Sequence, residues 1–412
     1  MLIHWIWLST RPGVSDRARA ELLRHFQDAE DIYFTEESAY AVADGLSEDA
    51  VAALCDKNLT SAEAILEECN RKQIHILTYR DAAYPARLRN ISDPPVVLYY
   101  KGRLPDFDGS PLIAVVGTRS ASSYGLTVAK RMGYQIASCG GIVVSGMAYG
   151  IDGMAMRGAL SAGASVIGVL GCGVDIVYPL SNRSLFADTE QNGCLLSEFA
   201  PGTPPQKWNF PKRNRLISGL SCGVLIVEAP EKSGALITAS QAAEQGRDVF
   251  VVPGNIDMPS CTGSNALLRD GAIAVSSGWD VLSEYAAQFP DKIHRESGRS
   301  HQTAYPDEVE MATQDSTLKV AQKPKKPAVK AEKTKKEIDK TVPCQYSDAE
   351  RKRPALQGDE AKIVALLEQG VELVDNIIAE TGMAAGAVLA VLTMLEVKGV
   401  IQRLPGKRVK LK

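Results

Sequence analysis

The feature that most constrains the fold of this chain is a series of short, continuously apolar runs in its middle part. The runs cover residues 112–116, 142–144, 165–170, 224–227 and 249–252, and segments of helical pattern separate them. Strands that are apolar along their whole length are buried on both faces, which is typical of a parallel sheet covered by helices. We therefore predict an α/β fold over residues 76–290, with a Rossmann-like, doubly wound and mostly parallel sheet.

Helical periodicity dominates the residues that precede this sheet. In 16–26 and 60–68 the apolar residues recur every three or four positions, which predicts helices with one buried face. The apolar stretch 2–8 is too short to cross a bilayer, and no other stretch reaches that length, so we expect a buried start and no membrane partner. Residues 1–75 are predicted to form a small helical module of the SAM or helix-hairpin-helix kind.

A polar stretch follows the predicted sheet. Residues 291–357 contain few large apolar side chains, and 319–340 holds nine Lys against three acidic residues. This composition predicts a basic, disordered linker. Both a solvated tether and an auxiliary nucleic-acid tail fit it.

The last residues, 358–412, recover a pattern of ordered elements. Helices over 359–369, 372–381 and 384–398 are predicted to precede a hairpin near the C-terminus. Three helices followed by a hairpin indicate a winged helix, a domain that often places its third helix in the major groove of DNA. Here the third helix is strongly apolar, so contact with another protein fits this module as well as DNA binding does.

Cysteine usage and net charge narrow the compartment and the classes of partner. Eight cysteines are scattered without a C-x-x-C pair, which favours a reducing, cytoplasmic compartment over disulfides or a zinc site. The formal net charge is −3. Such a value neither demands nor excludes nucleic acid, so the local distribution of charge must decide.

Small residues follow three successive predicted strands, in 117–120, 145–152 and 171–175. Ligands of doubly wound sheets bind outside the carboxyl ends of the strands, where such residues let backbone N–H groups approach an anion. The glycines could instead serve only to allow tight turns, but three such loops with Arg119 in the first favour a phosphate-binding rim. None matches a dinucleotide or P-loop signature, so no cofactor is expected.

The segment Lys207-Trp208-Asn209-Phe210-Pro211-Lys212-Arg213-Asn214-Arg215 combines four cations with two aromatic side chains. No Asp or Glu occurs between Pro201 and Val227. Cations neutralise phosphates, and aromatic faces stack on unpaired bases, which favours single-stranded over duplex DNA. The alternative is that Trp208 and Phe210 pack in the core while the two arginines form structural salt bridges.

Candidates for catalysis are few. The carboxylates near predicted strand ends are Asp152, Asp175, Glu198 and Glu228. No nucleophile–base pair or metal-ligand spacing accompanies them, and the five histidines lie outside the strand-end loops. We expect no catalytic residues, no metal and no enzymatic activity.

The motifs in 117–125, 144–152, 171–179, 210–219, 228–239 and 246–254, in this order, resemble the DNA-processing protein A family (DprA, also called Smf). The resemblance implies a homodimer that coats single-stranded DNA, protects it, and loads the recombinase RecA during natural transformation and recombination. It implies that Arg119 and Lys207 hold phosphates while Phe210 packs beside a base. One departure is Met156, at a position where the family usually has His.

The candidate DNA-binding residues come from the strand-end loops and from the basic segment with its continuation. They are Gly117, Thr118, Arg119, Ser120, Gly146, Gly150, Lys207, Phe210, Arg213, Asn214, Arg215, Ser218 and Gly219.

Two other functions stay open at this point. A nucleotide-processing hydrolase of the Rossmann-like lysine-decarboxylase-like group would share the architecture and bind phosphate at strand ends. Its Pro-Gly-Gly-x-Gly-Thr signature is absent, and the nearest fragment is Val252-Pro253-Gly254-Asn255. A protein-interaction scaffold would use the apolar third helix of the winged module.

Overall fold

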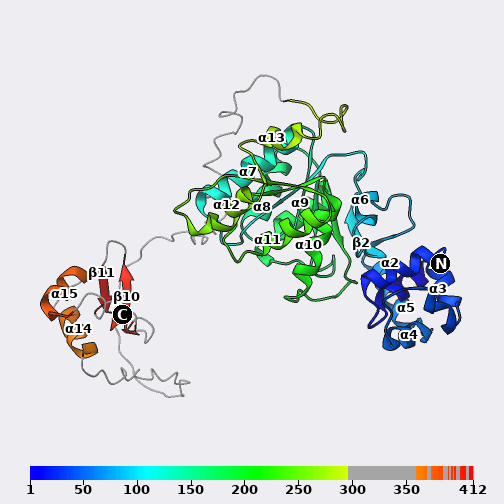
Figure 1. The fold of residues 1–412 in the computed structure, drawn as a ribbon, viewed down its shortest axis with the longest axis horizontal. Helices are drawn as coiled ribbons and strands as arrows, with labels where there is room; N and C mark the ends of the chain where they lie inside the picture. Colours follow the sequence, from blue (N-terminus) through cyan, green and yellow to red (C-terminus); the bar gives the residue numbers. More distant parts are fainter. Residues whose placement is uncertain are drawn as a thin grey trace, which may run out of the picture. The chain divides into compact units, whose positions relative to one another are not determined.

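A computed structural model describes residues 1–295, 359–368, 373–383, 388, 391–392, 394–395, 400–404 and 408–411. The chain divides into two compact units, Met1–Lys319 and Val320–Lys412. Figure 1 shows the helices and strands of both units. Apart from residues 291–295, the predicted linker lies outside the described residues, and the predicted boundaries between the modules stay predictions.

The first unit is built on a sheet in which nine of the described strands pair in the order β1-β2-β6-β5-β4-β3-β7-β8-β9. From β6 to β9 all neighbours are parallel, whereas β2 pairs antiparallel with both β1 and β6. The strands are β1 (His75–Thr78), β2 (Val97–Gly102), β3 (Leu112–Val116), β4 (Ile142–Ser145), β5 (Val166–Val169), β6 (Cys194–Ser197), β7 (Gly223–Ile226), β8 (Asp248–Val251) and β9 (Ile273–Ala274). The prediction of a doubly wound, mostly parallel sheet is confirmed.

Helices cover both faces of the sheet, because successive strand residues alternate between two buried clusters. On one face, Ile113 and Val115 of β3 pack with side chains of α7 (Ser123–Ser138), α8 (Ile151–Ser161), α9 (Arg183–Asn192) and α13 (Gly278–Ser283). On the other, Leu112 and Ala114 pack with α6 (Ala86–Arg89), α10 (Asn209–Leu220), α11 (Gly234–Glu244) and α12 (Thr262–Arg269).

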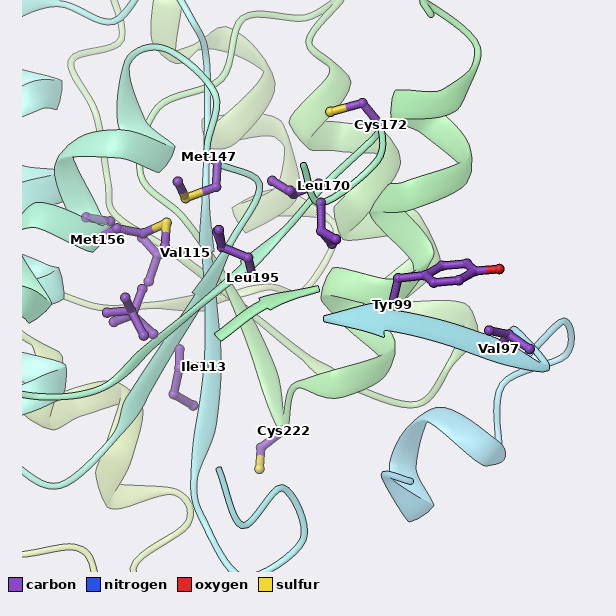
Figure 2. Close-up of a cluster of buried hydrophobic side chains, with 14 of the residues drawn as sticks. Val97, Tyr99, Ile113, Val115, Met147, Met156, Leu170, Cys172, Leu195 and Cys222 are labelled. Atoms are coloured by element: carbon purple, nitrogen blue, oxygen red, sulfur yellow. The ribbon is translucent and has the colours of Figure 1, made fainter. Parts of the chain in front are cut away.

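Figure 2 shows part of the first cluster, where Met147 and Met156 lie close to Val115 and Leu195. Met156 is fully buried. The residue that replaces the family's usual His therefore serves as core packing in this chain.

The residues before the sheet form a set of short helices, as the periodicity predicts. They are α1 (Leu2–Thr10), α2 (Asp16–His25), α3 (Ala29–Phe34), η1 (Glu37–Val42), α4 (Glu48–Cys55) and α5 (Thr60–Arg71). The apolar start is buried in α1, and its tryptophans belong to the same continuous core cluster as one face of the sheet.

The second unit contains α14 (Asp359–Glu368), α15 (Val374–Thr381) and a hairpin of β10 (Ile401–Leu404) and β11 (Arg408–Leu411). Its core includes Ile363, Ile377 and Val409. These elements agree with the predicted winged helix. Most of the predicted third helix, 384–398, lies outside the described residues.

Candidate nucleic-acid interface

The candidate site lies where the order of the strands reverses. The chain leaves β3 to form β4 on one side and later returns to add β7 on the other side. At such a switch point the loops that follow the two central strands part, which leaves a crevice at the carboxyl edge of the sheet. A cleft of about 650 Å³ opens there, lined by the loops after β3 and β7 and by the first turns of α10 and α11.

The structure brings eight of the predicted site residues to this cleft. Arg119, Ser120 and Lys207 are exposed, and the Arg119 Cζ lies 5.1 Å from the centre of the Phe210 ring. The other lining residues of the predicted set are Gly117, Thr118, Arg213 and Asn214. The cleft therefore joins two exposed cations to a half-buried aromatic ring.

Phe210 depends on a glycine for its position. A Cβ on Gly171 would lie 2.9 Å from the Phe210 Cδ1, so only glycine lets the ring lie against the loop after β5. Trp208, in contrast, is 69% exposed. The alternative in which both aromatic side chains of the segment pack in the core does not hold for Trp208.

A smaller hollow of about 70 Å³ adjoins the cleft and shares Arg119 and Phe210 with it. Gly146 lines this hollow, together with Tyr149 and Tyr178. The Tyr178 ring packs at 5.5 Å from that of Phe210. The sequence prediction missed both tyrosines. Each stands in a glycine-rich loop after a strand, where an aromatic side chain is not needed for core packing, and this could have indicated them.

Backbone contacts fix the loop after β3. The Thr118 N–H donates to the Glu228 carbonyl at 2.8 Å, and the Ser122 N–H and Oγ donate to the Glu228 carboxylate. Gly150 has φ of 75°, and a Cβ there would lie 2.4 Å from the Thr118 carbonyl oxygen. Gly150 therefore lets the loops after β3 and β4 touch, which places Arg119 at the rim.

Arg213 lies beneath the cleft and is not exposed on its surface. It is 3% exposed, and its Nη1 donates to the carbonyl oxygens of Gly146 at 2.7 Å and Val169 at 2.5 Å. Burial lowers the pKa of Arg213 to about 10, against the opposing charge of Asp152, so the guanidinium stays charged at neutral pH. Its role is to brace the loops after β4 and β5, and we remove it from the predicted set of direct DNA contacts.

Arg215 belongs to a buried ion-pair cluster on the side of α10 that faces α2. Its Nη2 lies 2.6 Å from the Glu198 Oε2 and 3.0 Å from the Asp16 Oδ2, while its Nε lies 3.0 Å from the Asp93 Oδ2. Burial raises the pKa of Glu198, and the charges of Arg215 and Lys212 oppose that rise. Arg215 has no free face for a phosphate, and this corrects its inclusion among the direct contacts.

Ser218 and Gly219 are corrected for the same reason. Ser218 is fully buried, and its Oγ donates to carbonyl oxygens of the preceding turn of α10. A Cβ on Gly219 would meet Leu88 of α6 at 2.9 Å and Ile91 at 3.1 Å. Both residues serve the packing of α10, and neither lines the cleft.

The four carboxylates that stand near strand ends all have structural partners. The Asp152 Oδ2 accepts from the Gly146 N–H at 3.2 Å, and Asp175 pairs with Lys72 at 2.5 Å. Glu198 pairs with Arg215, and Glu228 holds the loop after β3. Each carboxylate thus fixes a loop or a helix next to the cleft.

The described residues contain no group of three His, Cys, Asp or Glu side chains placed to hold a metal ion. Within the same part of the chain, no helix has the length and apolar character needed to cross a membrane.

Gly146→Ala is expected to destabilise the protein by about 1–3 kcal/mol, because the new Cβ would lie 2.3 Å from the Arg213 Nη1. Arg213 cannot yield easily, since Gly146 and Val169 hold it. Urea unfolding measures the loss. Gly234→Ala is the matched control, because nothing lies within 4 Å of its Cβ position. A midpoint for Gly146→Ala equal to that of the control would contradict the bracing role of Arg213.

Comparisons with known proteins agree with this geometry. The family model "DNA recombination-mediator protein A" matches residues 75–286, and "DprA winged helix domain" matches residues 347–407. Protein Smf of Synechocystis sp. is 32% identical over 98% of this chain and 97% of its own length. The DNA processing protein DprA of Bacillus subtilis is 42% identical over 53% of this chain and 74% of its own length.

Among solved structures, the X-ray structure of DNA processing protein A from Streptococcus pneumoniae is similar, with a TM-score of 0.62 and 33% identity. The match covers 69% of this chain and 98% of that one. Three findings indicate the same family: the full-length match to protein Smf, the two family models in their order along the chain, and the shared fold. The chain belongs to the DprA (Smf) family of DNA-processing proteins that act in recombination.

Proposed function

We propose that this protein binds single-stranded DNA in the switch-point cleft without catalysing a reaction on it. The observation that carries the proposal is the grouping of Arg119, Lys207 and Phe210 on one cleft. Asp152 is the only acidic side chain among the described residues that line the cleft. It is buried, and its carboxylate accepts a hydrogen bond from the Gly146 N–H. The rim therefore offers positive charge and an aromatic ring to an incoming strand.

Single strands suit this rim better than duplex does. Arg119 and Lys207 can neutralise phosphates of either form, but Phe210 can stack only on a base whose face is free. The carboxylates near the cleft are committed to loops, which supports binding rather than hydrolysis. Release of free base from nucleoside monophosphates would favour the hydrolase alternative instead.

The proposed role goes further than binding. We infer that the bound strand is protected and handed to the recombinase RecA during natural transformation and recombination, and that the protein acts as a homodimer. The description of the matching family as a recombination mediator supports this inference. We also infer a cytoplasmic location, because Cys55, Cys69, Cys172, Cys194, Cys222 and Cys261 form no disulfide, as a reducing compartment favours.

Fluorescence anisotropy with single-stranded and duplex oligonucleotides tests the function. Single strands are expected to bind more tightly, and Phe210→Ala is expected to weaken their binding by about 1–3 kcal/mol, the worth of one stacked base. Phe34→Ala is the matched control, since Phe34 is exposed on α3 and does not line the cleft. Equal affinity for duplex, or an equal effect of the two substitutions, would rule out the proposed mode.

A further inference from the structure

The cleft has a second side that the proposed contacts of Arg119, Lys207 and Phe210 do not use. This side is formed by the loop after β7 and the first turns of α11. Lys232 is exposed in that loop. Ser233 caps the helix, and its Oγ accepts from the Ala235 N–H at 3.3 Å.

Thr238 adds an unpaired hydroxyl to this side of the cleft. The residue lines the cleft, is only 1% exposed, and forms no hydrogen bond through its side chain with any residue that the structure describes. A helical threonine usually bonds the carbonyl oxygen four residues back. Here that oxygen belongs to Gly234 and accepts from the Asn214 Nδ2 at 3.3 Å. The hydroxyl faces the cleft without a partner among the described residues, so it can donate its proton to a ligand oxygen there.

Gly234 leaves the amino end of α11 accessible. The residue is exposed, and nothing lies within 4 Å of the position that a Cβ would occupy. Of the first N–H groups of α11, those of Ala235 and Leu236 donate to the Ser233 Oγ and carbonyl oxygen. The Gly234 N–H is left, at an end that the helix dipole makes favourable for anions. The Lys232 ammonium, the Thr238 hydroxyl and the Gly234 N–H together form a set of donors, which suits a phosphate.

We propose that Lys232, Thr238 and the amino end of α11 form a second phosphate subsite, which binds the phosphate of a neighbouring nucleotide of the same strand. The inference rests on the proposed binding of single-stranded DNA. It adds that phosphates of the strand are held on both sides of the switch point between β3 and β7, by Arg119 and Lys207 on one side and by the second subsite on the other. The cleft is then a two-point grip rather than a single anion site.

The subsite is tested with Lys232→Gln and Thr238→Val, each compared with wild type by anisotropy on an oligothymidylate. Loss of one phosphate contact lowers the salt dependence, the slope of log K against log salt, by about 0.7, which is about fivefold in affinity at 0.1 M salt. Loss of a hydrogen bond to a charged group is expected to cost about tenfold for Thr238→Val. Lys292→Gln and Thr60→Val are matched controls, because both residues are exposed and neither lines the cleft.

A set of oligonucleotides that carry one uncharged methylphosphonate at successive positions assigns the contacts. Wild type is expected to lose affinity at the linkages that face Arg119, Lys207 and the second subsite. Lys232→Gln should become insensitive at one linkage, and Arg119→Ala at a different one.

The outcomes distinguish a failure of the second subsite from a failure of the proposed function. Wild-type affinity and salt slope in Lys232→Gln and Thr238→Val, with Arg119→Ala still impaired, would overturn the second subsite alone. No binding of single strands by the wild-type protein would overturn the proposed function and the subsite with it. Loss in both cleft variants but in neither control supports the two-point grip.

Discussion

Arg215→Ala is expected to lower the free energy of unfolding by about 3–5 kcal/mol, because it breaks a buried ion pair on one side only. The side chains of Arg215 and Glu198 are each 4% exposed, and the Nη2–Oε2 distance is 2.6 Å. Without the guanidinium, Glu198 keeps the Lys212 Nζ at 3.4 Å, and Asp16 keeps the same ammonium at 2.7 Å. Asp16 also keeps the Arg19 Nη1 at 2.6 Å, so Glu198 is the carboxylate left with only one half-exposed lysine.

Urea unfolding followed by tryptophan fluorescence measures this loss. All four tryptophans, Trp5, Trp7, Trp208 and Trp279, belong to the first unit, so the signal reports on the sheet and its helices. Arg71→Ala is the matched control. It also removes an arginine paired with a glutamate, Glu68, but on the surface, where such a pair contributes about 0–1 kcal/mol.

A second substitution distinguishes two causes of the loss of stability, an unpaired buried carboxylate and the loss of the packing of the arginine side chain. Replacing Glu198 by Gln in the Arg215→Ala background removes the unpaired carboxylate and should recover part of the stability. No recovery, or a loss no larger than that of Arg71→Ala, would show that the cluster does not hold the first unit together.

The cluster also links the helices before the sheet to the helix that carries Phe210. Asp16 opens α2, whereas Lys212 and Arg215 lie on α10. The amino end of α10 carries the proposed strand contacts, and its middle is tied to α2. The orientation of the segment that carries Phe210 therefore depends on residues more than 190 positions away in the sequence.

The parallel part of the fold could be predicted from the sequence because buried parallel strands leave a local signal. The apolar runs at 112–116, 142–144, 165–170, 224–227 and 249–252 each overlap a strand, β3, β4, β5, β7 and β8 in turn. The edge strands β1 and β9, the strands β2 and β6, and the antiparallel pairing of β2 with β6 were not predicted. The pairing of β2 with β6 joins segments about 100 residues apart, as in the pair Tyr99 and Ser197, so no local pattern indicates it.

The site was predicted in part, for a related reason. The loops after β3, β4 and β5 gather at one edge because the strands are neighbours, and this follows from the fold class. The two arginines were misassigned because a run without nearby acids looks like a phosphate-binding stripe. Their partners, Asp16, Asp93 and Glu198 for Arg215 and two backbone carbonyl oxygens for Arg213, come from other elements. Nothing local to the segment indicates them.

The double substitution of Arg119 and Lys207 by Ala is expected to weaken binding of single-stranded DNA by about 25-fold at 0.1 M salt. Each lost phosphate contact should lower the salt slope by about 0.7, so the slope should fall by about 1.4. The two effects are expected to add if the residues hold different phosphates. Both side chains are exposed, so the folded state should be retained.

The control for this double variant removes the same charge at the opposite edge of the sheet. Arg269 and Lys292 are exposed; Arg269 ends α12, just before β9 begins, and the Lys292 backbone lies against Gly140, just before β4 begins. Replacing both by Ala should leave the salt slope almost unchanged, because neither side chain can reach a phosphate bound at the carboxyl edge of the sheet. Equal losses in the two double variants would mean that the whole charge of the first unit, rather than the cleft, attracts the strand. A normal slope in the Arg119 and Lys207 variant would place the strand elsewhere on the protein.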